Sequence, residues 1–264
     1  METPAASFPS SVPTAAAPTP PPEGWAVPAG HGAQWWGDAW RLFTGAAGTW
    51  LLITVVWLAI MIGLSIIPFL GQIAVSLLHP VFIGGLILGC LEQDRGGALK
   101  VSHLFAGFSE KLGPLVILAL LYIVGWMVVA CITFAVGLIT LGGSILALLA
   151  GGDTMQAGTA LLGTMGLSVL LVILVGLLFA VPLLMAFWFA PALIVLRGDG
   201  PWDAMMTSFR ACLRNIPPFL IWGLLGLAFA ILASIPLGLG FLVLFPVGTA
   251  TVYTSYKEIF GVPA

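Results

Sequence analysis

Charged residues are scarce in this chain of 264 residues, because Asp, Glu, Lys and Arg together make up only 7% of it. An ordinary soluble domain carries about 25% charged residues. Hydrophobic residues make up 60% of the chain, and its formal net charge is only −2. The composition therefore excludes an ordinary soluble globule, and the lack of a basic surplus argues against a nucleic-acid partner.

Signatures of catalysis are also missing. The sequence holds three cysteines, Cys90, Cys131 and Cys212, and no CxxC motif, which argues against a disulfide framework or a zinc site. It contains no Walker A loop, no HExxH and no GxSxG motif. We therefore expect no enzymatic activity, no metal and no cofactor.

Long charge-free runs are what the sequence offers instead. Between Arg41 and Glu92 lie fifty residues without Asp, Glu, Lys or Arg, and the runs 112–152, 154–196 and 215–256 are each longer than forty. A membrane-spanning helix needs about 20 apolar residues. Backbone N–H and C=O groups must pair within the chain in hydrocarbon, which favours helices. We expect an all-α, polytopic membrane helical bundle.

Proline and glycine divide these runs into spans. Pro68 and Gly71 mark a turn in the first run, and Pro236 and Gly238 mark one in the last. We expect the Gly-rich stretch 137–160 to be the longest outer connection, as a loop or as a re-entrant or interfacial helix. About six transmembrane helices are expected, near 47–67, 71–91, 114–137, 163–190, 217–236 and 238–256.

The first thirty residues do not belong to this bundle. They hold eight of the nineteen prolines, and their only charged residues are Glu2 and Glu23. Such a composition offers no core, so 1–30 is expected to be a disordered Pro/Ala-rich cytoplasmic tail of open role. The six-span transmembrane domain then covers 31–261.

The basic residues all fall on one side of this map. They are Arg41, Arg95, Lys100, Lys111, Arg197, Arg210, Arg214 and Lys257. Lys and Arg accumulate in cytoplasmic loops. We therefore expect a multi-pass protein of the bacterial inner (cytoplasmic) membrane with both termini in the cytoplasm.

Short amphipathic segments precede the first, third and fifth expected spans. In 203–216, Arg210 and Arg214 lie on a polar face, and a separate apolar face is formed by Met206, Phe209, Leu213 and Ile216. Such helices lie in the membrane interface. Arg210 and Arg214 are therefore the candidate lipid-headgroup contacts, although plain anchoring of the chain explains the same pattern.

One ionisable side chain lies deep in an expected span. His79 is near the middle of 71–91 and precedes Pro80. An ionisable group is costly in the bilayer, so it is a functional candidate by default. A neutral imidazole that bonds to another helix, or to a carbonyl freed by Pro80, explains it equally. His79 is the candidate intramembrane polar site, and no catalytic, cofactor-binding or metal-binding residue is expected.

A faint internal repeat relates the first and last hairpins. An offset of 166 residues aligns Trp36 with Trp202, Phe43 with Phe209, Pro80 with Pro246 and Glu92 with Glu258. Repeats occur in many transporters, and they also occur in bundles that transport nothing. We expect a non-enzymatic membrane protein that associates with membrane lipids or other membrane proteins. The alternative is a small-molecule permease built on the repeated hairpins.

Five stretches carry a resemblance to known proteins. They are WGDAWRLF at 36–43, FAPALIVL at 189–196, GPWDAM at 200–205, SFRACLRN at 208–215 and TVYTSYKEIF at 251–260. As a set they resemble a family of uncharacterised six-span bacterial inner-membrane proteins, over residues 33–261. The resemblance implies location and number of spans. The family has no assigned activity, so it brings no catalytic residue to this chain.

Overall fold

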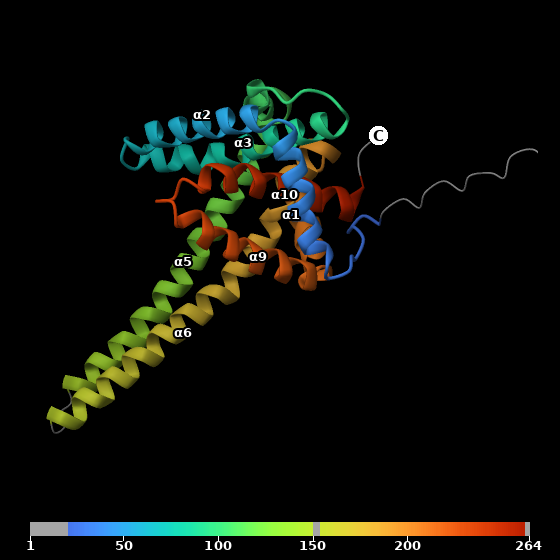
Figure 1. The fold of residues 1–264 in the computed structure, drawn as a ribbon. Coiled ribbons are helices and arrows are strands. Elements are labelled where there is room, and N and C mark those ends of the chain that lie inside the picture. Colours follow the sequence, from blue (N-terminus) through green and yellow to red (C-terminus); the bar gives the residue numbers. More distant parts are fainter. Residues whose placement is uncertain (1–20, 150–153, 262–264) are drawn as a thin grey trace, which may run out of the picture.

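The computed structural model describes residues 21–149 and 154–261. Within these two ranges every regular element is a helix and no β-strand occurs. Three helical hairpins extend from a region where several shorter helices gather (Figure 1). The expected all-α, polytopic helical bundle is confirmed.

Each hairpin pairs two consecutive long helices. The pairs are α2 (Ala47–Ser65) with α3 (Leu70–Asp94), α5 (Leu112–Leu149) with α6 (Thr154–Trp188), and α9 (Ile216–Ser234) with α10 (Phe241–Phe260). Helices α3 and α10 contact each other, so the first and last hairpins lie side by side. The α5–α6 hairpin projects away from both (Figure 1).

Short helices precede each hairpin, as expected. We call α1 (His31–Gly45), η1 (Val101–Phe105), α4 (Ala106–Glu110) and α8 (Pro201–Arg214) the collar. Helix α8 begins with Pro201 and carries Asp203 in its first turn, which suits the positive end of a helix dipole. The brief helix α7 (Ala190–Ala192) and the π-helical turn η2 (Leu193–Arg197) connect α6 to α8.

Five segments of the described helices are long and apolar enough to cross a membrane. They are Ala47–Ser65, Leu70–Asp94, Leu112–Gly143, Met165–Arg197 and Ile216–Ser234. The sixth expected span, 238–256, overlaps α10, which begins and ends a few residues later; α10 is 20 residues long but less apolar, and it is not among these five segments. Its C-terminal half carries Thr, Ser and Tyr side chains followed by Lys257 and Glu258. The Thr, Ser and Tyr side chains face the interior of the protein, because Thr251, Ser255 and Tyr256 are buried.

The middle hairpin corrects the expected connection over 137–160. Helix α5 continues to Leu149 and α6 already begins at Thr154, so the expected span 114–137 lies inside α5, and the expected span 163–190 extends just past the end of α6 at Trp188. Residues 150–153 between them lie outside the described residues. Glycine weakens a helix in water by about 1 kcal/mol. In hydrocarbon an unpaired backbone costs more, so Gly142 and Gly143 remain helical.

The tightest core lies where the collar meets the hairpins. Trp35 of α1, Trp50 of α2, Phe189 before α7, and Tyr253 and Tyr256 of α10 are each at most 1% exposed. In contrast, α5, α6 and α9 expose many Leu, Ile, Val and Phe side chains along their described lengths. An apolar exterior is what a lipid environment requires, because water is absent there.

Residues 21–30, which the composition assigned to the disordered tail, lie against the helices. The Trp25 N–H donates to the Ile259 carbonyl at 2.8 Å, and the Val27 N–H donates to Asn215 Oδ1 at 2.9 Å. Gly24 adopts a φ of 76°, and a side chain there would overlap Ile259. The packed part of the chain therefore begins before residue 31, because buried partners hold a segment that has no core of its own. Residues 1–20 lie outside the described residues.

Candidate functional site

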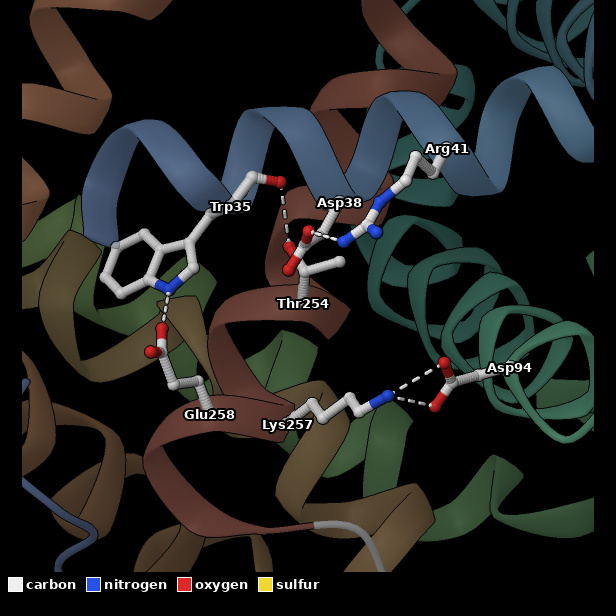
Figure 2. A network of polar contacts seen from close by, with 7 residues as sticks. All are labelled: Trp35, Asp38, Arg41, Asp94, Thr254, Lys257 and Glu258. Atoms are coloured by element: carbon white, nitrogen blue, oxygen red, sulfur yellow. Dashed lines mark hydrogen bonds and ion pairs between the residues drawn. The ribbon is translucent and has the colours of Figure 1, made fainter. Parts of the chain in front are cut away.

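A polar cleft lies among α1, α3 and α10, where the collar meets the first and last hairpins. Its volume is about 480 Å³. It is lined by Asp38, Arg41, Leu42, Gln93, Asp94, Tyr253, Thr254 and Lys257. Figure 2 shows that α1 supplies Asp38 and Arg41, α3 supplies Asp94, and α10 supplies Thr254 and Lys257.

Two ion pairs organise the charges of the cleft. Lys257 Nζ donates to both carboxylate oxygens of Asp94, at 2.8 Å and 2.6 Å, and the Tyr253 hydroxyl donates to Asp94 at 2.9 Å. Arg41 pairs with Asp38 three residues earlier on α1. The Arg41 and Lys257 side chains are 80% and 44% exposed. Both cations therefore remain accessible from the cleft.

Buried and part-buried hydrogen bonds connect the helices around the cleft. The Trp50 indole donates to Gln93 Oε1 at 3.3 Å, and the Gln93 amide donates to the Leu42 carbonyl. On the other side, Thr254 donates to the Trp35 carbonyl at 3.1 Å, while the Trp35 indole donates to Glu258 (Figure 2). The positions of the cleft's charged groups are therefore fixed by α1, α3 and α10 together.

The cleft offers donors and acceptors for a polar ligand. Arg41 and Lys257 supply cationic donors, and Asp38 and Asp94 supply anionic acceptors. Among the residues that the structure describes, no three His, Cys, Asp or Glu side chains are grouped so that they could hold a metal ion.

The candidate headgroup residues Arg210 and Arg214 lie against the N-terminal segment. Arg214 is 3.2 Å from a carboxylate oxygen of Glu23 and donates to the Gly24 carbonyl at 3.3 Å. Arg210 is 3.8 Å from the other oxygen of Glu23. The Arg210 and Arg214 side chains are still 56% and 48% exposed. Their contact with lipid headgroups stays a prediction.

Asn215 binds the same N-terminal segment from the end of α8. Its side chain is fully buried; its amide donates to the Trp25 carbonyl at 3.0 Å and to the Ala211 carbonyl at 2.9 Å. Together with the bond from Val27, the side chain engages the backbone on both sides of Ala26. Arg197 adds a bond to the Pro22 carbonyl at 3.2 Å. Four polar side chains, Arg197, Arg210, Arg214 and Asn215, thus fasten this segment.

Burial raises the pKa of two groups near α8. It raises the pKa of the Asp199 carboxyl; neighbouring Arg197 lowers this pKa in part, and Asp203 raises it further. Burial also raises the pKa of the Cys212 thiol to about 12, against a smaller lowering by the hydrogen bond with Ser208. At neutral pH Cys212 is therefore a thiol packed in a helix interface and a poor nucleophile.

His79 lines a separate cavity of about 480 Å³ between α3, α9 and α10. Its walls are mainly aromatic and aliphatic, and include Trp36, Trp188 and Trp222. Gln72 and Ser76 lie on the same helix but are not among the lining residues, and Ser76 donates to the Gln72 carbonyl at 2.9 Å. His79 therefore lines this cavity, whereas the polar side chains of Gln72 and Ser76 on the same helix do not.

Sequence reasoning did not single out the polar cleft or Asn215. The pair Asp94–Lys257 joins positions 163 residues apart, and each residue alone reads as the charged end of a span. Asn215 lies just after an amphipathic helix and ahead of Pro217, a position typical of a helix boundary. A signal for the cleft appears only once α3 and α10 are known to be neighbours.

Comparison with known proteins gives one informative similarity. The chain is 28% identical, over 254 residues, to a protein of Burkholderia thailandensis described as a probable inner membrane protein; the match covers 89% of this chain and 93% of that protein. No protein-family model matches the chain. No solved structure matches it. The apolar helices and this similarity together identify the chain as a polytopic helical membrane protein similar to a probable bacterial inner-membrane protein.

Proposed function

We propose that this membrane protein is non-enzymatic and associates with membrane lipids through its collar, with both termini in the cytoplasm. The observation that carries the proposal is the gathering of basic residues at the collar and at the helix ends that adjoin it. All eight Lys and Arg residues lie there. Since Lys and Arg accumulate on the cytoplasmic side, the collar is assigned to that side.

The three hairpins support six membrane crossings. Each hairpin leaves the collar with its first helix and returns with its second, so its tip belongs to the opposite side. Lys257 near the end of α10 pairs with Asp94 at the end of α3, which agrees with a common side for both helix ends. The exposed apolar surfaces of α5 and α6 then face lipid or other membrane proteins. Nucleic acid is not an expected partner.

The surface of α8 supports association with lipid. Its buried face consists of Ala204, Met205, Ser208, Ala211 and Cys212. Trp202 and Leu213 are 62% and 46% exposed, and the half-exposed Arg210 and Arg214 accompany them. Exposed apolar groups beside basic groups are typical of a helix that lies in the interface. Each basic residue near an anionic membrane contributes about 1 kcal/mol.

Protease protection in vesicles tests this role of α8. We expect Arg210→Gln with Arg214→Gln to speed trypsin cleavage at Arg197 in vesicles of anionic lipid, and to have little effect in neutral vesicles. Glu23→Gln is the matched control, since it breaks the ion pairs with both arginines but keeps their charges. If Glu23→Gln speeds cleavage as much as the double variant in both kinds of vesicle, the arginines serve the N-terminal segment and lipid contact is refuted.

The cavity beside His79 supports the second candidate, a small-molecule permease. A permease needs converging polar groups near the membrane midplane, and this cavity offers His79 and Thr249 among mainly apolar walls. Solute accumulation in cells with the chain, without it, and with His79→Ala tests the alternative. Accumulation that depends on His79 would favour the permease over the lipid-associated role.

A further inference from the structure

We propose that the cleft among α1, α3 and α10 binds a phosphoethanolamine group, that is, a phosphate and a primary ammonium joined by a short linker, as in a zwitterionic phospholipid headgroup. This inference rests on the proposed association with lipid, but it concerns a site distinct from Arg210 and Arg214. It assigns the phosphate to Arg41 and Lys257 and the ammonium to Asp38.

The balance of charges in the cleft selects a ligand of both signs. Two carboxylates, Asp38 and Asp94, and two cations, Arg41 and Lys257, line the same space. A purely anionic ligand meets two carboxylates there, and a purely cationic ligand meets two cations. Like charges that lose their solvent raise the free energy of binding. A ligand that carries one anionic and one cationic group can satisfy both kinds of partner.

The two ion pairs leave some N–H donors of Arg41 and Lys257 unused. Arg41 has five N–H donors and its side chain is 80% exposed, while its contact with Asp38 uses one nitrogen. Lys257 has three donors, of which two are directed at Asp94. Guanidinium and ammonium groups are common phosphate ligands. The donors that remain on Arg41 and Lys257 therefore suit phosphate oxygens.

The two carboxylates have different roles. Asp94 accepts both bonds from Lys257 and a further bond from Tyr253, so it anchors the lysine. Asp38 is 45% exposed, and one of its oxygens contacts Arg41. Its second oxygen is the acceptor available to an ammonium group.

The cleft also lies at the depth where headgroups lie. Asp94 and Lys257 stand where the charge-free runs of α3 and α10 end, at the boundary of the apolar layer. The collar helix α1 packs on α10 and supplies Asp38 and Arg41 to the same cleft (Figure 2). At about 480 Å³ the cleft is within the size of small-molecule sites, about 300–1,000 Å³.

The test uses the full chain in a mild detergent and native mass spectrometry. The probes are dihexanoyl phosphatidylethanolamine, dihexanoyl phosphatidylglycerol and water-soluble phosphoethanolamine. We expect wild type to prefer the ethanolamine lipid over the glycerol lipid. Equal binding of soluble phosphoethanolamine would identify the free compound as a source of the same group, whereas binding of the lipid alone would identify the headgroup.

Two variants test the phosphate contact and the ammonium contact separately. Arg41→Gln should weaken binding of both lipids about tenfold, which corresponds to about 1.4 kcal/mol. Asp38→Asn should weaken only the ethanolamine lipid by a similar factor, and so remove the preference. Both side chains are exposed enough that the fold should tolerate the changes.

Gln34→Ala is the matched control, because Gln34 is exposed on α1 and does not line the cleft, so this variant should bind both lipids as wild type does. Arg210→Gln separately tests the lipid contact proposed for α8. The inference is overturned if Arg41→Gln and Asp38→Asn bind both lipids as wild type does. It is also overturned if Arg210→Gln weakens lipid binding and the cleft variants do not. That second pattern would leave the proposed role of α8 standing, so the two failures are distinguishable.

Discussion

At the scale of single residues, the buried amide of Asn215 holds the N-terminal segment, which has no hydrophobic core of its own, by hydrogen bonds to its backbone. Its side chain is fully buried and bonds to Trp25, Val27 and Ala211. Asn215→Ala removes the hydrogen-bond partner of the part-buried Trp25 carbonyl and of the part-buried Val27 N–H. Such a loss costs about 1–3 kcal/mol, so the thermal midpoint in detergent should fall and cleavage after Glu23 by a Glu-specific protease should accelerate.

Gln34→Ala provides the comparison for this change, because Gln34 is exposed on α1. We expect it to alter neither the midpoint nor the cleavage rate. A variant Asn215→Ala that behaved like Gln34→Ala would show that the N-terminal segment is held without this side chain.

Cys212 provides a second residue-scale prediction. Burial raises the pKa of its thiol to about 12, from an ordinary value of 9.0. The reactive thiolate fraction at pH 8 is therefore lowered about a thousandfold. In a chain with Cys90→Ala and Cys131→Ala, labelling of Cys212 by a water-soluble maleimide should be slower by about this factor than in denaturant. Labelling at the rate of a cysteine introduced by Gln34→Cys would contradict the burial of this thiol.

At the scale of elements, α1 and α9 approach through a glycine. A Cβ atom on Gly32 would overlap the Pro218 carbonyl, whereas a Cβ atom on Gly37 of the same helix would meet nothing within 4 Å. Gly32→Ala should therefore push α1 from α9 and destabilise the protein by about 1–3 kcal/mol. Gly37→Ala should be neutral or stabilising, since alanine favours a helix by about 1 kcal/mol. Thermal unfolding of the two variants measures this difference, and equal midpoints would refute the close approach.

The existence of the helices was predictable, whereas the faces that they bury were not. Charge-free runs and proline–glycine turns predicted the hairpins, and the amphipathic period predicted α8. The face of α8 that packs inward combines Met205 with small residues such as Ala204 and Ser208, whereas Leu213 on the apolar face is 46% exposed. The usual rule places large apolar residues inside. A bilayer also accommodates exposed apolar side chains, so for a helix in contact with lipid this rule does not predict which face packs against the protein.

The polar cleft, like the buried faces of the helices, could not be predicted from local sequence patterns. Asp38, Arg41, Asp94 and Lys257 become neighbours only because α1 and α3 both pack on α10. No local pattern marks any of the four, since charged residues at the ends of spans are ordinary. The repeat aligned Glu92 with Glu258, yet Glu258 contacts His31 and Trp35 beside the cleft, so the repeat did not point to its lining residues.

At the scale of the whole molecule, the hairpins make the topology testable. The tips of the first and last hairpins hold Phe69 and Leu237, whose side chains are 86% and 97% exposed and whose φ values are 61° and 54°. These tight turns carry no basic residue. They belong to the side opposite the collar if each hairpin crosses the membrane twice.

Reporter fusions should therefore divide the chain by side. Alkaline phosphatase, which is active only after export, should be active when fused after Phe69 or Leu237 and inactive after Gly261. Green fluorescent protein, which fluoresces in the cytoplasm, should give the opposite pattern. A fusion at Asp153, outside the described residues, should behave like those at the two tips. Export of a reporter fused after Gly261 would place the C-terminus outside. The collar and the adjoining helix ends, which together hold the eight basic residues, would then lie on the outer side, and the assignment of the collar to the cytoplasmic lipid surface would be wrong.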